Sequence, residues 1–201
     1  GVSEGYTAKA SCLNGIESVK NFGLIGLYIL EPAEPLPPMT QDDIDFERFQ
    51  TMSVFGLKED LESLMSGKKP VNIMNLIKTI INKYAKSSGK VNFIQNLRSS
   101  EDYIYKHSIN VAVLAALMGA RLGISVDDMR DMIYAALVHD IGKLYIPAEL
   151  LEKQSYSQED INTMMSCELK GNKHLLELSF FNDNIKHILQ QKFLLQNDKD
   201  V

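Results

Sequence analysis

The chain has 201 residues, of which 45% are hydrophobic, so it is long and apolar enough to form at least one domain with a core. A formal net charge of −5 and the lack of a long basic run argue against a nucleic-acid polymer as its partner. Two cysteines, Cys12 and Cys167, provide no disulfide framework, and we expect a reducing, cytoplasmic location.

The N-terminal part has a mixed pattern. The aliphatic stretch LIGLYIL at 24–30 predicts a short strand. It is far shorter than the ~20 apolar residues that a membrane-spanning helix needs, so we expect no membrane segment. Prolines within 31–39 interrupt regular structure and mark an internal boundary. We expect an N-terminal module over residues 1–60, with this strand and a following helix, and a helical domain over residues 61–201.

From residue 40 onward the apolar residues recur with helical rather than strand periodicity. Ser125 and the SQED sequence at 157–160 have the pattern of helix N-caps. The first helix is either whole or broken near Gly56, where a glycine lowers helix propensity. The expected helices cover 41–67, 71–86, 99–123, 125–142, 157–171 and 184–195. The chain is therefore predicted to be mainly α.

Two histidines and an aspartate carry the strongest indication of chemistry. The residues at helical spacing from His107 are apolar, which predicts that His107 faces inward: Ile104, Val111, Leu114 and Met118. His139 and Asp140 end a strongly apolar helix. Because burying a carboxylate without a partner is costly, Asp140 needs a cation or hydrogen-bond donors. A divalent metal bound by both histidines meets this need, and so does an ion pair with Lys143.

An ordered series of motifs resembles one family. The series is EDYIYKHS at 101–108, HDIGK at 139–143, IPAELLEK at 146–153 and SQED at 157–160. It resembles the HD superfamily of metal-dependent phosphohydrolases, and within it most closely the HD-GYP domains, which are bacterial cyclic di-GMP phosphodiesterases. The resemblance covers roughly residues 99–192. It implies a helical bundle around a multinuclear metal centre, often of iron or manganese, where a metal-activated water attacks a phosphodiester.

The resemblance also implies roles for single residues. His107, His139 and Asp140 match metal ligands of the family. Lys143 matches the lysine that meets the substrate phosphate, so Asp140 and Lys143 are the candidate catalytic residues. The implied cofactor is a divalent metal, either iron, manganese or zinc.

The C-terminal half departs from the family pattern at ligand positions. Cys167 and Glu168 stand where the family has a histidine and a proline, although Gly171 is kept. Two glutamines, Gln190 and Gln191, replace histidines, and the next residue is a lysine instead of an acid. The Gly-Tyr-Pro stretch is absent from this sequence. Since glutamine amides are weak metal ligands, we expect the multinuclear site to be degenerate.

Other residues are candidate replacement ligands. Cys167 binds metal as a thiolate, which favours zinc or iron. Glu168 reaches the site if its helix is rotated, and His187 lies one turn before the two glutamines. His174 is a further candidate only if the helix continues past Gly171.

The sequence leaves three functions open. The first is a catalytically degenerate HD-GYP-like domain, with or without metal, that acts as a regulatory or interaction module in bacterial signalling. The second is a phosphohydrolase or phosphodiesterase with a reduced metal site and a nucleotide or cyclic dinucleotide substrate. The third is structural only, with Asp140 paired to Lys143. The apolar segment 46–65 also predicts a homodimer contact or a contact with a signalling partner protein.

Overall fold

The structure of the protein is a computed structural model that describes residues 40–86, 102–151, 153 and 155–197. The chain divides into two compact units, Gly1–Thr40 and Gln41–Val201, and the division directly follows the proline-rich stretch. The strand predicted at 24–30 lies outside the described residues. Residue 60, where the N-terminal module is expected to end, lies inside a helix of the second unit.

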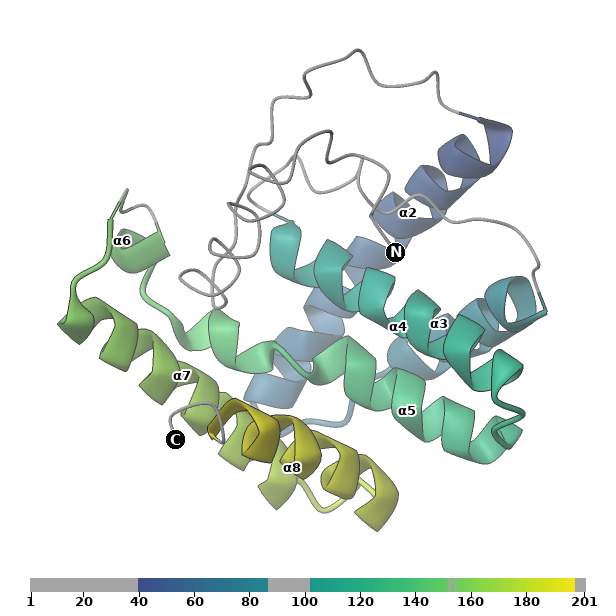
Figure 1. The fold of residues 1–201 in the computed structure, drawn as a ribbon. Helices are drawn as coiled ribbons and strands as arrows, with labels where there is room; N and C mark the ends of the chain where they lie inside the picture. The colour runs from purple at the N-terminus through teal and green to yellow at the C-terminus, as the bar shows by residue number, and fades with distance from the viewer. Residues whose placement is uncertain (1–39, 87–101, 152, 154, 198–201) are drawn as a thin grey trace, which may run out of the picture. The chain divides into compact units, whose positions relative to one another are not determined.

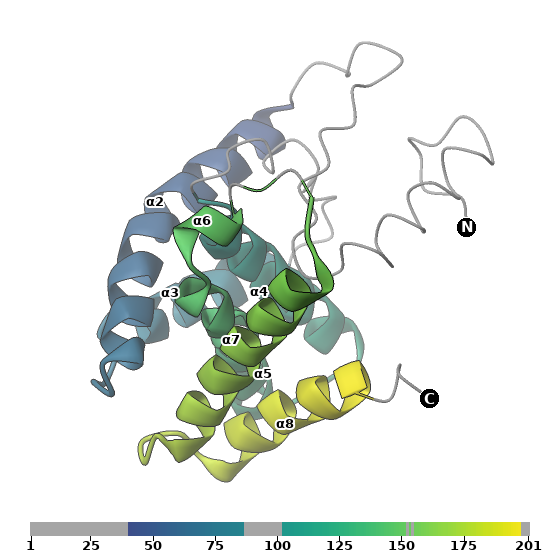
Figure 2. The same ribbon diagram turned by 90° about the vertical axis from the view of Figure 1, so that its left-hand side faces the viewer.

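The second unit is helical wherever its described residues have regular structure, which confirms the predicted all-α fold (Figures 1 and 2). The elements are α2 (Gln41–Met65), α3 (Ile73–Ile80), the π-helical turn η1 (Ile81–Ala85), α4 (Tyr103–Arg121), α5 (Val126–Val138), the 3-10 helix η3 (Ile141–Tyr145), α6 (Ala148–Leu151), α7 (Gln158–Glu177) and α8 (Asp183–Asn197).

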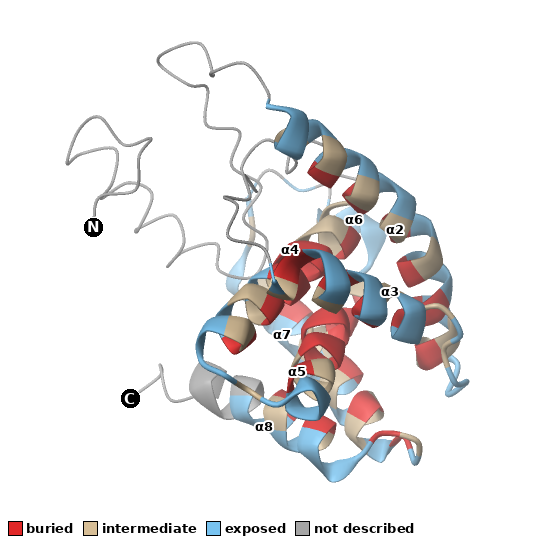
Figure 3. Ribbon diagram, turned by 90° about the vertical axis from the view of Figure 1, so that its right-hand side faces the viewer, coloured by how far each residue is buried: buried red, intermediate tan, exposed pale blue. Residues whose placement is uncertain are grey.

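Helix α2 is unbroken at Gly56, so the first predicted helix is whole. Its buried face repeats every three or four residues and comprises Phe46, Gln50, Val54, Leu57, Asp60, Leu61 and Leu64. The outer face is exposed along its length (Figure 3). Met52 and Phe55 on this face are 71% and 73% exposed. The homodimer contact expected for this segment stays a prediction.

Helices α4 and α5 pack side by side and form the centre of the unit. Helices α2 and α3 also contact this pair, α8 packs on α5, and α7 packs on η3. The core-facing residues Ile109, Val113, Ile133 and Leu137 are fully buried. Because full burial of an aliphatic side chain contributes about 1.5–3 kcal/mol, this contact holds the end of α5 in place against α4.

Two side-chain caps predicted from the sequence are confirmed. The Ser125 hydroxyl accepts from the Asp128 N–H at the start of α5. Ser157 and Asp160 form a reciprocal capping box at the start of α7. Hydrogen bonds from Lys153 and Ser157 lower the pKa of Asp160 to about 2, so the cap stays ionised at a lower pH than an ordinary aspartate would.

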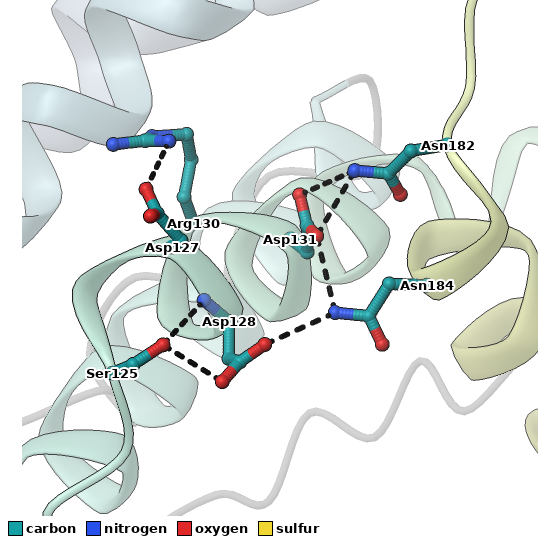
Figure 4. Close-up of polar contacts among 7 residues, drawn as sticks. All are labelled: Ser125, Asp127, Asp128, Arg130, Asp131, Asn182 and Asn184. Carbon is teal, nitrogen blue, oxygen red and sulfur yellow. Dashed lines mark hydrogen bonds and ion pairs between the residues drawn. The ribbon is translucent and has the colours of Figure 1, made fainter.

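Asparagine amides attach the start of α8 to α5 (Figure 4). The Asn182 Nδ2 donates to both carboxylate oxygens of Asp131, at 3.1 and 3.0 Å. The Asn184 Nδ2 donates to Asp131 at 3.1 Å and to Asp128 at 3.5 Å. The Asn182 Oδ1 also accepts from the Ile185 N–H at 2.8 Å, in the manner of a helix cap. These bonds fix where the first turns of α8 lie.

A buried carboxylate on α2 caps the start of α3. Asp60 is 2% exposed and accepts from the N–H groups of Val71 at 2.9 Å, Asn72 at 2.7 Å and Ile73 at 2.5 Å. We expect Asp60→Ala to lower the free energy of unfolding by about 2–3 kcal/mol, because buried helix N–H groups lose a charged acceptor. Urea denaturation would measure this loss. Glu62→Ala, an exposed change on the same helix, should cost less than about 0.5 kcal/mol, and an equal loss in both variants would contradict the capping role.

Candidate metal centre

The end of α5 orients the first candidate ligand. The helix ends at Val138, so the predicted end just before Gly142 is wrong: the chain tightens into the 3-10 helix η3 instead. The last carbonyls of a helix need donors from outside it. The His139 Nδ1 lies 2.7 Å from the Ala136 carbonyl oxygen and supplies such a donor. Because a carbonyl oxygen only accepts, Nδ1 carries the proton of this bond, and the ring directs its Nε2 toward Asp140.

The 3-10 geometry brings Asp140 and Lys143 together. Asp140 is the N-cap residue of η3, and its carbonyl oxygen accepts from the Lys143 N–H at 3.0 Å. Side chains three residues apart eclipse each other in this type of helix. The Lys143 Nζ accordingly lies 2.6 Å from the Asp140 Oδ2. The ion pair that the sequence offered as one alternative is therefore present.

His107 lies at the edge of the buried face of α4, and the prediction that its apolar stripe faces inward is wrong. Leu114 and Met118 of that stripe are 43% and 59% exposed. The fully buried face instead contains Ala112 and Ala116, whose small side chains let α5 approach closely. Both faces of α4 are apolar, so periodicity alone does not tell them apart. The His107 side chain is 32% exposed as a result.

Three side chains with metal-binding atoms lie close together where α4, the end of α5 and the start of η3 meet. Among the described residues, His107, His139 and Asp140 form a group in which one ligand atom of each lies within 4.8 Å of the others. The His139 Nε2 is 3.1 Å from one Asp140 carboxylate oxygen, and the His107 Nε2 is 3.6 Å from the other. Asp140 is 5% exposed, and His139 is 16% exposed. The sequence predicted these three residues, and the structure brings them together.

The chemistry of the donor set fits a divalent metal. The His139 Nε2 and an Asp140 carboxylate oxygen lie 3.1 Å apart, and both are atom types that bind divalent metals. Two imidazoles and one carboxylate suit zinc, manganese or iron. The partial exposure of His107 leaves the outer side of the group accessible.

One residue that the sequence argument missed supports the His107 ring. Tyr103, one turn earlier on α4, stacks on it with ring centroids 5.8 Å apart and ring planes 14° apart. The signal was available in the spacing, because aromatic residues four positions apart on a helix meet on one face. Tyr103 therefore restricts the orientation of His107.

The replacement ligands proposed on α7 lie beside η3 but have other contacts. The Cys167 Sγ donates to the Tyr145 carbonyl oxygen at 3.4 Å. The Glu168 backbone packs directly on Gly142. Neither residue belongs to the group of three.

Helix α7 continues through Gly171 to Glu177, so the doubt about its length is resolved. It carries His174 to α2, where its Nε2 lies 2.7 Å from the Leu64 carbonyl oxygen. On α8, His187, Gln190 and Gln191 are exposed. Neither His174 nor His187 belongs to the group of three that the described part of the chain forms.

A glycine pair holds η3 against α7. A Cβ added to Gly142 would lie 2.5 Å from the Glu168 Cα and 2.8 Å from its carbonyl oxygen. A Cβ added to Gly171 would lie 2.6 Å from the Gly142 backbone nitrogen. Only glycine fits at such backbone approaches. The kept Gly171 therefore sets the position of the turn that bears Asp140 and Lys143.

Comparisons with known proteins agree with the location of this group. Residues 104–197 match the family model of the HD domain, a range that contains all three candidate ligands, α4 apart from its first residue, and α5 to α8. Residues 1–23 match a second model, described as a domain of unknown function (DUF1508). The predicted resemblance is thus confirmed at the level of the HD domain, while the HD-GYP subtype and the degeneracy stay predictions.

A curated relative gives a second comparison. The chain is 28% identical over 82 residues to a 3'3'-cGAMP-specific phosphodiesterase 1 of Vibrio cholerae serotype O1. The alignment covers 41% of this chain and 19% of the relative. No solved structure matches. Among the residues searched, which are those that the structure describes, no helix is long and apolar enough to cross a membrane.

Proposed function

We propose that the second unit is a metal-dependent phosphodiesterase domain that acts in the bacterial cytoplasm on a nucleotide, and most specifically on a cyclic dinucleotide. The observation that carries this proposal is the convergence of His107, His139 and Asp140 within 4.8 Å. Its support from comparison is the HD-domain match and the cyclic dinucleotide phosphodiesterase among the relatives.

Each residue of the site would have a separate role in binding metal or phosphate. His107, His139 and Asp140 would hold one divalent metal, which supplies Lewis-acid activation of a phosphoryl oxygen and of water. The Ala136 carbonyl keeps His139 in the metal-binding tautomer. The Lys143 ammonium would bind a phosphate oxygen as a point charge. The exposed side of His107 is where substrate would approach.

The test is metal content together with turnover. We expect about one metal per chain in the wild type. We expect His139→Ala to lose it and to hydrolyse 3'3'-cGAMP or cyclic di-GMP at least about 100-fold more slowly, because the ligand that η3 and α5 position together is gone. Mass spectrometry of the purified proteins and product chromatography measure the two effects. A wild type that stays metal-free after supply of iron, manganese and zinc would contradict the proposal.

His187→Ala tests whether the metal is held by the group of three alone or also by a replacement ligand on α8. The variant should keep its metal, because His187 is exposed on α8 and outside the group of three. Loss of metal in His187→Ala would mean that α8 contributes a ligand, and the three-residue site would be wrong.

A second candidate is the degenerate module that regulates a signalling partner. It is favoured by the exposure of Gln190 and Gln191, which stand where the family has histidine ligands. This candidate requires that a cyclic dinucleotide raises the melting temperature of the protein without being hydrolysed. Product formation by the wild type that is lost in His139→Ala would exclude it.

A further inference from the structure

Lys143 contacts the carboxylate oxygen toward which a candidate metal ligand also points. The Lys143 Nζ is 2.6 Å from the Asp140 Oδ2, and the His107 Nε2 is 3.6 Å from the same oxygen. The Lys143 side chain is 13% exposed and the Asp140 side chain is 5% exposed. The ammonium therefore contacts the same carboxylate that would hold a metal together with His107 and His139.

Charge makes the two cations competitors. An ammonium and a divalent metal that bind the same carboxylate repel each other, and burial strengthens this repulsion because little water screens it. Asp140 in turn needs a cation because a buried carboxylate without one is strongly unfavourable. One site thus has two alternative cations, one from the chain and one from solution.

The backbone keeps the internal cation close. Lys143 follows Asp140 by one 3-10 turn, which aligns their side chains. The packing of Gly142 against Glu168 fixes that turn on α7. The lysine side chain nonetheless has a flexible stem of four carbons, so its ammonium can leave the carboxylate without movement of the backbone.

We propose that Lys143 is the counter-ion of Asp140 in the metal-free protein and that a metal must displace its ammonium to bind. Lys143 thereby lowers the affinity for metal. Metal binding would also free the Lys143 ammonium to bind a substrate phosphate. Metal binding and substrate binding would thereby be linked. This inference rests on the proposed metal site and specifies how that site is regulated.

Metal binding by Lys143→Met tests the inference, measured by calorimetry with Mn²⁺ or Zn²⁺ alone and the purified 201-residue chain. We expect the metal Kd to fall at least about tenfold, because the competing charge is removed. Lys143→Arg keeps the charge and should bind metal about as weakly as the wild type. Without metal, Lys143→Met should melt at a lower temperature than the wild type, and metal should raise its melting temperature by more.

Lys153→Met is the matched control. Lys153 also pairs with an aspartate, Asp160, at 2.7 Å, but its side chain is 45% exposed and Asp160 is outside the group of three. The same loss of charge there should leave the metal Kd unchanged. If both Lys143→Met and Lys153→Met bound metal more tightly, the change in net charge alone would explain the effect, and the inference would be overturned.

The outcomes separate this inference from the proposed function. Metal-dependent hydrolysis by the wild type, with no tighter metal binding in Lys143→Met, overturns the role of Lys143 and leaves the phosphodiesterase. Tighter binding in Lys143→Met with no hydrolysis in any variant supports the counter-ion and overturns the phosphodiesterase. Metal binding in neither protein overturns both.

Discussion

Asp140→Ala is expected to lower the free energy of unfolding of the metal-free protein by about 3–5 kcal/mol. The physical reason is the position of Lys143, whose ammonium lies 2.6 Å from the carboxylate in a largely buried site. Removing one partner of such a pair leaves an unneutralised charge that the fold has already taken out of water. Asp140→Asn should lose less, because its amide oxygen still accepts a hydrogen bond from Lys143. Urea denaturation in a chelating buffer measures both losses.

The stability gained on adding metal distinguishes the structural role of Asp140 from its proposed role as a metal ligand. At about 100 times its Kd, a metal that binds only the folded protein adds about 2.7 kcal/mol to the stability of the wild type, and it should add nothing to Asp140→Ala. Asp127→Ala is the control, since Asp127 is 84% exposed in its pair with Arg130 and should change stability by less than about 0.5 kcal/mol. If metal leaves the wild type unchanged, Asp140 has a structural role through its contacts with Lys143 and the two histidines and does not bind metal.

The features predicted well from the sequence are those that local rules determine. The periodicity of apolar residues located α2 to α5, α7 and α8 because amphipathic helices must bury one face, but it did not locate α6. Ser125 and Ser157 marked helix starts because their side chains cap N–H groups of the same turn. Asp140 was identified because a carboxylate at the end of an apolar helix needs a cation or donors, whereas the roles of His107 and His139 as ligands came mainly from the family resemblance.

The wrong predictions concern features that depend on contacts between segments far apart in the sequence. The apolar stripe of α4 through Leu114 and Met118 looks like a core face, but small residues on the other side, such as Ala112, allow the closer approach to α5. Gly142 looks like a helix stop, yet its role is contact with Glu168 on α7. No local pattern reports a contact between segments that are distant in sequence.

Gly171→Ala is the sharpest test of that contact. The added Cβ would lie 2.6 Å from the Gly142 backbone nitrogen, and backbone atoms cannot move aside as a side chain can. We expect a loss of about 4 kcal/mol in the free energy of unfolding, above the usual 1–3 kcal/mol for an overpacked core, because η3 must separate from α7. Thermal and urea denaturation measure the loss.

Gly119→Ala is a matched control, because it adds the same methyl group inside a helix. Its Cβ would meet the flexible ends of Met132 at 3.0 Å and Met129 at 3.3 Å, which can rotate away. The gain in helix propensity, about 1 kcal/mol, should offset the crowding there. A large loss at Gly171 beside a small change at Gly119 would locate the effect in the contact with η3.

The same variant connects the fold to the site. Asp140 and Lys143 flank Gly142, so a shift of η3 away from α7 carries both side chains away from His107, which α4 holds. Gly171→Ala should therefore weaken metal binding even at temperatures where the protein remains folded, although Gly171 contributes no donor atom. A variant that is destabilised but binds metal with the wild-type Kd would mean that the end of α5, through His139 and its bond to the Ala136 carbonyl, positions the ligands without support from α7.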